Sequence, residues 1–306
     1  GRAALQSQGP ALFAPDPVGA PPRPCTFCTR PGGTVWTKQN LPLFESDRAL
    51  NTLPPGVPGW PVCRACRVAL WAMPYGAWVT QSSATVLTCD DAAVEREFAA
   101  RNLMRTGRIR QLGFAKLKTS AGPEAIAVRA LREHAADFGG ACTLWTFKND
   151  NEKPWLRVAE TRQGIARFLR AVQADADCRR GWADLQRSLH RRNRSGAVTV
   201  DGATAAARIL FDPADGEQCD RLPQELKERA GDPDALSRRT LRGWRALCRL
   251  YLEVMHDMDP GRLDRVTVML ADWIAQDGSR GRFNEFRRAV NSAYELHKLL
   301  MHASAR

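Results

Sequence analysis

The clearest pattern of hydrophobic and polar positions lies in the C-terminal quarter of the chain. Apolar residues recur at every third or fourth position between Leu241 and Leu300. Pro260-Gly261 and Asp277-Gly278 interrupt the pattern, and Pro and Gly commonly end helices. Because residues three and four apart share one helix face, the pattern predicts three amphipathic helices. We expect them to form a C-terminal three-helix bundle over residues 236–306.

The middle of the chain, residues 90–235, mixes two kinds of pattern. Residues 91–103 and 165–172 have helical spacing, and an aspartate at the start of the first segment is a suitable N-cap. Between them, the β-rich segments 142–147 and 155–158 flank a polar turn, which predicts a β-hairpin. We therefore expect a mixed α/β region.

The N-terminal part lacks a long apolar pattern. Residues 1–24 are rich in Pro, Gly and Ala, which predicts an extended arm. Residues 25–89 contain the Pro- and Gly-rich stretch Leu53–Gly59, which cannot form a hydrophobic core by itself. Some other interaction has to bring the two ends of this segment together.

Two Cys-x-x-Cys pairs, separated by 34 residues, can supply that interaction. The four residues are Cys25, Cys28, Cys63 and Cys66. Two short chelating pairs are typical of a structural, tetrahedral zinc site. A pair of disulfides or four unrelated buried cysteines are the alternatives. The remaining cysteines, which lie among apolar neighbours and indicate reduced core residues, are Cys89, Cys142, Cys178, Cys219 and Cys248.

These patterns together predict an α+β fold. It consists of an N-terminal zinc-binding module with irregular loops, a β-hairpin-containing region and a C-terminal helical bundle. The start of the chain lacks a secretory signal, and no apolar run approaches the ~18 residues that span a bilayer. Reduced cysteines and the absence of such segments predict a cytoplasmic protein.

The charge of the chain predicts a polyanionic partner. Its formal net charge is +12, and most of its 45 basic residues are arginines, which suit phosphate binding. The sequence lacks a basic amphipathic helix flanked by exposed Trp or Phe, so nucleic acid is favoured over an anionic membrane.

Three basic segments are candidate contacts to nucleic acid. The first is an acid-free window that contains Arg101, Arg105, Arg108, Arg110, Lys116 and Lys118. The second is the predicted hairpin turn, with Lys148, Asn149 and Asn151, and the third contains Arg191, Arg192 and Arg194. We interpret the first window as a loop or strand pair that follows a phosphate backbone. An ordinary basic surface and a plain hairpin tip are the alternatives.

The sequence shows no catalytic motif. Its five histidines are isolated, and it lacks a Gly-x-Ser-x-Gly elbow, a Walker-type loop and a Gly-x-Gly-x-x-Gly loop. This favours a binding protein over an enzyme. The alternative is a nuclease whose metal is held by His256, Asp257 and Asp259.

Several segments resemble one family. The cysteine module, with Val62-Cys63-x-x-Cys66-x-x-Ala69-Leu70-x-x-Met73-Pro74-Tyr75-Gly76, resembles the N-terminal zinc module of the large subunit of type I CRISPR interference complexes (Cascade), closest to the I-B-like variety. Residues 143–149, 156–158 and 168–169 are similar to a later block of that family, and residues 241–297 resemble its C-terminal bundle. The chain is short for this family, so a type IV large subunit is a related possibility.

The resemblance implies a non-enzymatic subunit of a crRNA-guided ribonucleoprotein, with structural Zn²⁺. Such a subunit reads the protospacer-adjacent motif in target double-stranded DNA and promotes duplex opening and R-loop formation. Its partners are crRNA, the handle-binding and filament-forming backbone subunits, a small subunit, and a helicase-nuclease or transposition factor.

Charge and context assign a role to each basic segment within this hypothesis. The acid-free window contacts duplex or handle phosphates, the hairpin turn lies near the motif, and the third segment holds the displaced strand. The alternatives are a free-standing zinc-containing DNA- or RNA-binding factor and a zinc-stabilised nuclease.

Overall fold

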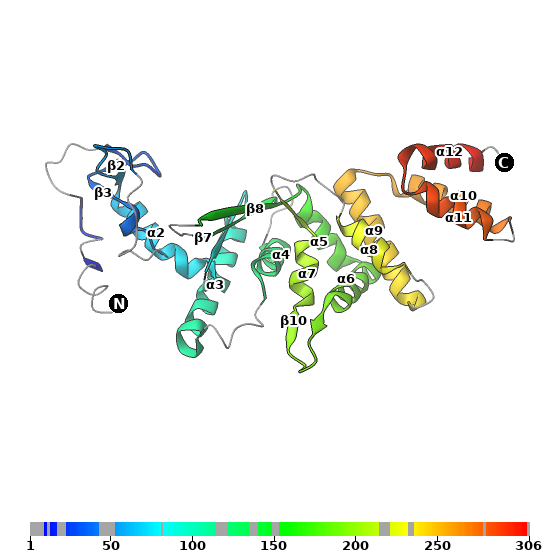
Figure 1. Ribbon diagram of the computed structural model, residues 1–306, viewed down its shortest axis with the longest axis horizontal. Coiled ribbons are helices and arrows are strands. Elements are labelled where there is room, and N and C mark those ends of the chain that lie inside the picture. The colour runs from blue at the N-terminus through cyan, green and yellow to red at the C-terminus, as the bar shows by residue number, and fades with distance from the viewer. Residues whose placement is uncertain are drawn as a thin grey trace.

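The structure is a computed structural model that describes most of the 306 residues. The described ranges are 9–10, 13–16, 23–42, 53–80, 82–113, 121–134, 140–148, 153–213, 221–231, 236–277 and 280–304. Figure 1 shows an elongated molecule in which an N-terminal module, a central α/β unit and a group of C-terminal helices follow one another along the long axis. The fold is α+β, as predicted.

The N-terminal module consists of short elements around a small core. Its elements are β1 (Arg23–Pro24), β2 (Pro31–Gly32), β3 (Thr34–Trp36), a 3-10 helix (Lys38–Asn40), β4 (Trp60–Val62) and α2 (Arg64–Gly76). The strand pairs β1–β2 and β3–β4 are both antiparallel. Within the described part of the module, the buried cluster contains Cys25, Trp36, Val62 and Cys63. The irregular module predicted from the sequence is therefore a pair of two-stranded sheets followed by a helix.

The predicted arm is fastened to α2 in its described part. Arg67 of α2 is 1% exposed, and its Nη2 donates to Asp16 Oδ1 at 2.8 Å and to the Ala14 carbonyl at 2.9 Å. Thr34 Oγ1 donates to the same Asp16 oxygen at 3.0 Å. The rings of Phe13 and Trp71 meet edge to face. Residues 13–16 thus form part of the N-terminal module.

A five-stranded antiparallel sheet lies at the centre of the molecule, in the order β11-β8-β7-β6-β5. The strands are β5 (Trp78–Val79), β6 (Ala84–Cys89), β7 (Cys142–Lys148), β8 (Trp155–Thr161) and β11 (Phe211–Pro213). The predicted hairpin is confirmed as β7–β8. The boundary at residue 89 was wrong, because β5 and β6 belong to this sheet and the cysteine module ends with α2.

Seven helices and a small hairpin complete the described central unit. They are α3 (Ala92–Leu112), α4 (Pro123–His134), α5 (Ile165–Ala174), α6 (Ala176–Leu189), α7 (Gly202–Arg208), α8 (Arg221–Arg229), α9 (Arg238–His256) and the hairpin of β9 (Arg191–Arg192) and β10 (Val198–Val200). One continuous apolar core joins the sheet to these helices. The central unit is therefore stabilised mainly by apolar burial.

Helix α3 is longer than the sequence pattern predicted. Asp91 caps it by accepting from the Ala93 N–H at 2.8 Å, as expected. Its buried residues end at Asn102, yet the helix continues to Leu112. The interpretation of the described part of the basic window as a loop or strand pair was wrong, because those residues extend α3. The apolar pattern ends before the helix does, because the second half of α3 does not pack against the core.

The C-terminal helices group differently from the prediction. Trp244, Leu247 and Tyr251 of α9 are buried in the central core, so α9 is not part of a separate bundle. The C-terminal group consists of α10 (Pro260–Ala275), α11 (Gly281–Ala289) and α12 (Ala293–Ser304), around a smaller apolar cluster. The third predicted helix is split into α11 and α12. An amphipathic stripe predicts a helix but does not identify the surface that covers it.

Two glycines explain why α9 packs on α6. A Cβ on Gly181 would lie 2.2 Å from the carbonyl oxygen of Gly243, so the two helix backbones cross in direct contact. This close approach requires glycine on both helices. Within the described residues, no helix is both long and apolar enough to span a membrane.

Candidate metal centre and basic surfaces

The four cysteines of the two Cys-x-x-Cys pairs come together in the N-terminal module. Their sulfur atoms all lie within 4.8 Å of one another, and Cys28 Sγ and Cys63 Sγ are 3.6 Å apart. None of the four is in a disulfide, whose S–S bond would be about 2.05 Å. Zinc–sulfur bonds of about 2.3 Å in a tetrahedron place sulfurs about 3.8 Å apart. The four thiols can therefore hold a metal such as zinc.

Two turns position these sulfurs. Cys25 and Cys28 lie in the turn between β1 and β2, where the Cys25 N–H donates to the Arg30 carbonyl at 2.8 Å. Cys63 is the N-cap of α2, and Cys66 lies in the first turn of that helix. Gly32 lets the two turns meet, because a Cβ at this position would lie 2.8 Å from the Cys63 nitrogen.

The surroundings of the sulfurs favour a mixture of thiolate and thiol in the absence of metal. Arg30 Nε lies 3.3 Å from Cys28 Sγ, and this hydrogen bond lowers the pKa of Cys28 to about 6. Burial opposes ionisation of Cys25, but backbone hydrogen bonds outweigh it and lower its pKa. Burial raises the pKa of Cys66 to about 12. A bound cation stabilises all four as thiolates, so metal binding releases protons here.

A second group of potential metal ligands is an ion-pair cluster. Glu97, Glu133 and His134 are close enough to share a cation. Their carboxylates already face arginines, with Arg101 Nη2 2.8 Å and Arg129 Nε 2.9 Å from Glu133 oxygens. The guanidinium groups supply the positive charge that a metal would bring. We therefore assign this group to the packing of α3 against α4.

The arginines nearest the start of the basic window are structural. Arg101 joins α3 to α4 through the ion pair just described. Arg105 Nη1 donates to the Val79 carbonyl at 2.7 Å, and its guanidinium lies 4.7 Å from the centre of the Trp78 ring. Both side chains are engaged within the protein. Their prediction as nucleic-acid contacts stays untested, but the geometry gives each a packing role.

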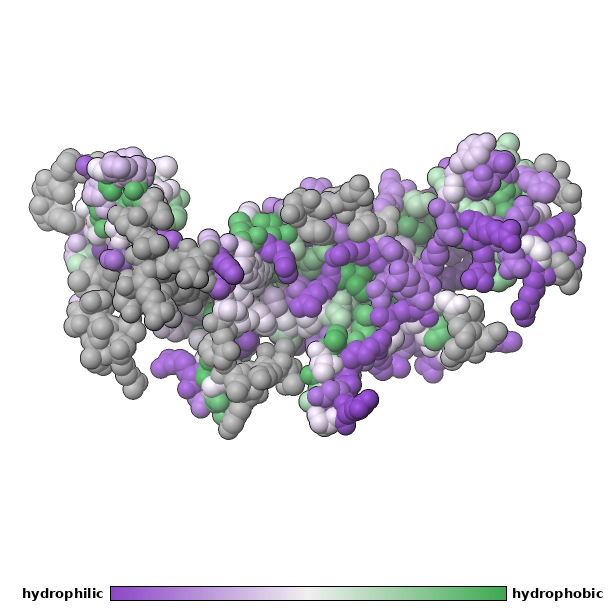
Figure 2. Space-filling model, in the orientation of Figure 1, coloured by the Kyte–Doolittle hydropathy of each residue, from purple (hydrophilic) through white to green (hydrophobic). Residues whose placement is uncertain are grey.

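The other predicted arginines of α3 and of the β9–β10 hairpin are exposed. They are Arg108, Arg110, Arg191, Arg192 and Arg194. Among the described residues, none of these five arginines forms an ion pair. In Figure 1 the C-terminal end of α3 and the tip of the hairpin project from the same side of the central unit, and in Figure 2 both projections carry hydrophilic residues. We call these five residues the edge arginines.

The remaining predicted contacts give less information. Lys148, at the end of β7, is partly exposed. Four predicted residues, Lys116, Lys118, Asn149 and Asn151, lie outside the described residues.

The alternative metal cluster of His256, Asp257 and Asp259 is not formed within the described residues. His256 Nε2 lies 3.2 Å from Arg162 Nη1, and its ring contacts Tyr251. Within the described residues, the candidate metal groups are the two above, and neither contains His256, Asp257 or Asp259. The αL conformation of Asp257 ends α9 and turns the chain toward α10.

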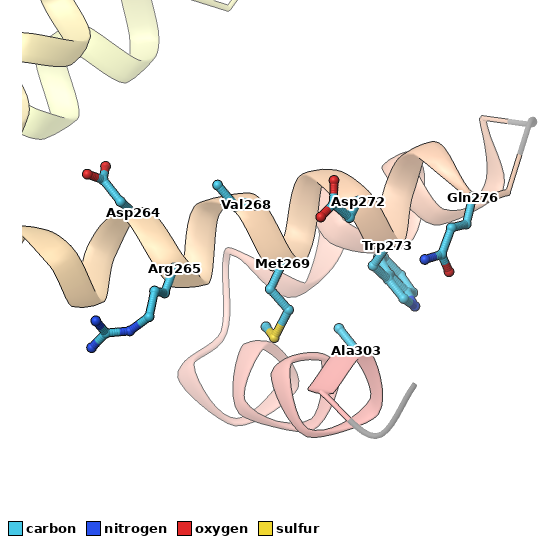
Figure 3. A pocket seen from close by; sticks show the side chains of 8 residues that line it. All are labelled: Asp264, Arg265, Val268, Met269, Asp272, Trp273, Gln276 and Ala303. Atoms are coloured by element: carbon cyan, nitrogen blue, oxygen red, sulfur yellow. The ribbon is translucent and has the colours of Figure 1, made fainter.

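Sequence reasoning missed a cavity in the C-terminal group. Figure 3 shows Met269 and Trp273 of α10 directed toward Ala303 of α12. The space that these residues line, together with Val268, has a volume of about 540 Å³. Asp264, Arg265, Asp272 and Gln276 complete its lining. Met269 and Trp273 belong to the predicted helical stripe, whereas Val268 and Ala303 do not, and the stripe gave no signal of a cavity.

Comparison of the chain with models of known protein families, with curated proteins and with solved structures finds no match.

Proposed function

We propose that this protein binds nucleic acid as the large subunit of a crRNA-guided surveillance complex. In this role it contacts the protospacer-adjacent motif, promotes opening of the duplex and offers a docking surface for a helicase-nuclease or transposition factor. The proposal combines the resemblance of the cysteine module and later segments to that family with the surface of the central unit. A structural Zn²⁺ held by the four cysteines is part of it.

The observation that carries the nucleic-acid part is a difference in how arginines are paired. Arginines between elements of the central unit face carboxylates: Arg208 Nε lies 2.8 Å from Glu124, and Arg242 Nε lies 2.7 Å from Asp177. The edge arginines face none among the described residues. Grouped cations without counter-charges repel one another. A phosphate backbone relieves this repulsion and releases its own counterions on binding.

The contacts of the hairpin arginines support this role. Arg191 Nη1 donates to the Ser188 carbonyl at 2.6 Å, and Arg192 Nη1 donates to the Gly196 carbonyl at 3.0 Å. These bonds use only part of each five-donor guanidinium. The side chains are thus held in place while most of their donors remain directed at solvent or a ligand.

The first test is co-expression of the chain with the products of its neighbouring genes. We expect a stoichiometric complex that contains one uniform short RNA and one zinc ion per copy of this chain. A protein that purifies alone, with zinc and with intrinsic affinity for DNA, would instead support a free-standing zinc-containing factor.

The second test concerns the edge arginines in target-DNA binding by that complex. Replacing all five with alanine should weaken binding and reduce the dependence of log K on log salt by about 1 for each phosphate that the variant no longer neutralises. The matched control is Arg287→Ala with Arg288→Ala, since both are exposed arginines of α11. Equal effects of the two sets would show that only net charge matters and would overturn this assignment.

A further inference from the structure

The C-terminal group of helices has a small core. Counted over the described residues, its buried cluster consists of Trp273, Ala289, Leu299 and Ala303. A cluster of this size removes little apolar surface from water. None of the candidate metal groups found among the described residues lies in α10, α11 or α12. The group therefore gains stability when another surface covers it.

One face of α10 is partly uncovered beside the cavity described above. Arg265, Val268, Met269 and Asp272 lie on this face, since the last three follow Arg265 at three, four and seven residues. Val268 is 55% exposed. Figure 3 shows Val268 and Met269 between Arg265 and Asp272 along the helix. We call these four residues the α10 face. It has an apolar centre, a cation at one end and an anion at the other.

The two charges of the α10 face are available to a partner. Arg265 Nη2 lies 3.8 Å from Asp259 Oδ2, but the two side chains are 75% and 63% exposed, so water screens this pair. Within the described residues, Asp272 forms no ion pair. A partner that brings an anion to Arg265 and a cation to Asp272 therefore gains two contacts without breaking a strong one.

The pattern of the α10 face is complementary to itself. Arg265 precedes Val268 by three residues, and Asp272 follows Met269 by three residues. When a second α10 lies antiparallel across the first, Arg265 of each copy therefore faces Asp272 of the other copy. Val268 and Met269 then meet their own counterparts near the two-fold axis. A two-fold interface uses the same surface on both copies, and the α10 face meets that requirement.

We propose that the α10 face joins two copies of this chain in an antiparallel, two-fold symmetric dimer. The second copy covers the space of about 540 Å³ that Met269 lines. Figure 1 shows the C-terminal group at the end of the elongated molecule opposite the N-terminal module, so two copies can meet there without burying the module. The inference goes beyond the proposed function and does not rest on it.

The test measures the mass of the purified full chain in solution. Analytical ultracentrifugation over a concentration series from nanomolar to high micromolar should show a reversible equilibrium that ends at twice the mass of one chain. Asp272→Arg places two arginines opposite each other at both ends of the interface, and Arg265→Asp does the same with two aspartates. Each should weaken dimerisation by at least about 10-fold, because like charges repel across an interface. A chain that stays monomeric at all concentrations would overturn the proposal.

Exchange of the charges tests the antiparallel pairing. An equimolar mixture of the Asp272→Arg and Arg265→Asp proteins should form a heterodimer in which both charge pairs are again opposite in sign. The chain that carries both substitutions should dimerise with itself like the unmodified protein. Such a rescue would show that the single variants are folded. If neither combination restores dimerisation, the proposed pairing is overturned.

Arg288→Asp is the matched control. It makes the same change of charge at an exposed position of α11 and should leave dimerisation unchanged. If it weakens dimerisation as much as Arg265→Asp does, net charge and not the α10 face controls association, and the proposal is overturned.

The outcomes distinguish this inference from the proposed function. A monomeric chain whose complex contains guide RNA and binds target DNA would overturn the dimer alone. A dimer that acquires neither RNA nor target DNA would support the dimer and refute the proposed function. If the chain is monomeric and the two charge variants lose a co-purifying subunit, the α10 face binds a different protein, and the dimer is overturned.

Discussion

The N-terminal module and the central unit are stabilised by different means. Counted over the described residues, the buried apolar cluster of the module has four members, two of which are cysteines of the candidate metal centre. The corresponding cluster of the central unit, counted in the same way, contains 26 buried residues from the sheet and its helices. A four-residue core removes too little apolar surface from water to offset the entropy of ordering the chain. We therefore expect the module to depend on a metal held by the four cysteines, whereas the central unit depends on packing.

Backbone segments lie close together in both parts of the molecule, but in different settings. In the module, the backbone at Gly32 lies against the backbone of Cys63, beside the cysteine sulfurs. In the central unit, backbone segments approach through helices that touch at Gly181 and Gly243. Loss of metal should therefore release only the module, and a packing defect should affect only the central unit.

The largest effect is expected from the metal centre. Cys63→Ser removes a ligand and the sulfur at the start of α2, and should unfold the module, because structural zinc contributes about 10–16 kcal/mol to small zinc-dependent folds. Hydrogen exchange followed by mass spectrometry should show loss of protection up to α2 and unchanged protection of β6 to α9. Treatment with a strong zinc chelator should give the same pattern.

Cys89→Ser is the matched control for that experiment. Cys89 is a partly buried cysteine outside the cluster, and its sulfur accepts the Asp91 N–H, a role that a hydroxyl can fill. It should retain zinc and the protection of the module. A Cys63→Ser protein that keeps its N-terminal protection would show that the module folds without metal and would remove the basis of the comparison.

The next largest effect concerns packing in the central unit. A Cβ on Gly202 would lie 1.9 Å from the Gln186 carbonyl oxygen, which forces α7 away from α6. Gly202→Ala should lower the free energy of unfolding of the central unit by about 3 kcal/mol, at the upper end for overpacking, because rigid backbone is the obstacle. Urea unfolding followed by tryptophan fluorescence would measure it, with zinc content unchanged.

Gly107→Ala is the control with the opposite sign. Gly107 lies inside α3 with no atom within 4 Å of an added Cβ. Alanine should raise stability by about 0.5–1 kcal/mol, since glycine is unfavourable in a helix interior. Equal destabilisation by both substitutions would mean that the α6–α7 contact has no special role in the central unit.

Local sequence patterns predicted what depends on local geometry. The spacing of the four cysteines predicted the candidate metal centre, and alternation predicted the β7–β8 hairpin. The order of the sheet could not be predicted, because β6 pairs with β7 across more than fifty residues and the pairing leaves no local signal. The same limit applies to α9, whose stripe gave no indication that α6 would cover it.

The density of basic residues along the sequence gave the least information about the candidate nucleic-acid contacts. Arg101 and Arg105 belong to the same acid-free window as Arg108 and Arg110, yet the first two are used within the fold. The partner of Arg101 comes from α4, and Arg105 reaches β5. Only the tertiary structure separates arginines that stabilise the protein from arginines that remain available for a ligand.

A smaller effect is expected where the arm joins the module. Asp16→Ala removes the carboxylate that faces buried Arg67. Breaking a fully buried pair costs about 3–5 kcal/mol, but Asp16 is 29% exposed and Arg67 keeps the Ala14 carbonyl, so we expect about 1–2 kcal/mol. Hydrogen exchange should show faster exchange at residues 13–16 while zinc stays bound. Release of zinc by this variant would show that the arm helps to hold the metal centre together.

The smallest effect is expected from the ion pairs on the surface of the central unit. The hydrogen bond from Arg129 is the main cause that lowers the pKa of Glu133. A carboxylate with a lowered pKa stabilises the folded state above its unfolded pKa, and this contribution is lost as the pH falls through the folded pKa. Because Glu133 is 37% exposed, Glu133→Gln should cost less than about 1 kcal/mol at pH 7.

The difference between Glu133→Gln and the unmodified protein should therefore disappear on acidification toward pH 3, which urea titrations at a series of pH values would measure. A cost comparable to that of Gly202→Ala would show that the ion pairs joining α3 to α4 are as important as packing. The central unit would then depend on charge as well as on its apolar core, and the division between a metal-dependent module and a packing-dependent unit would have to be redrawn.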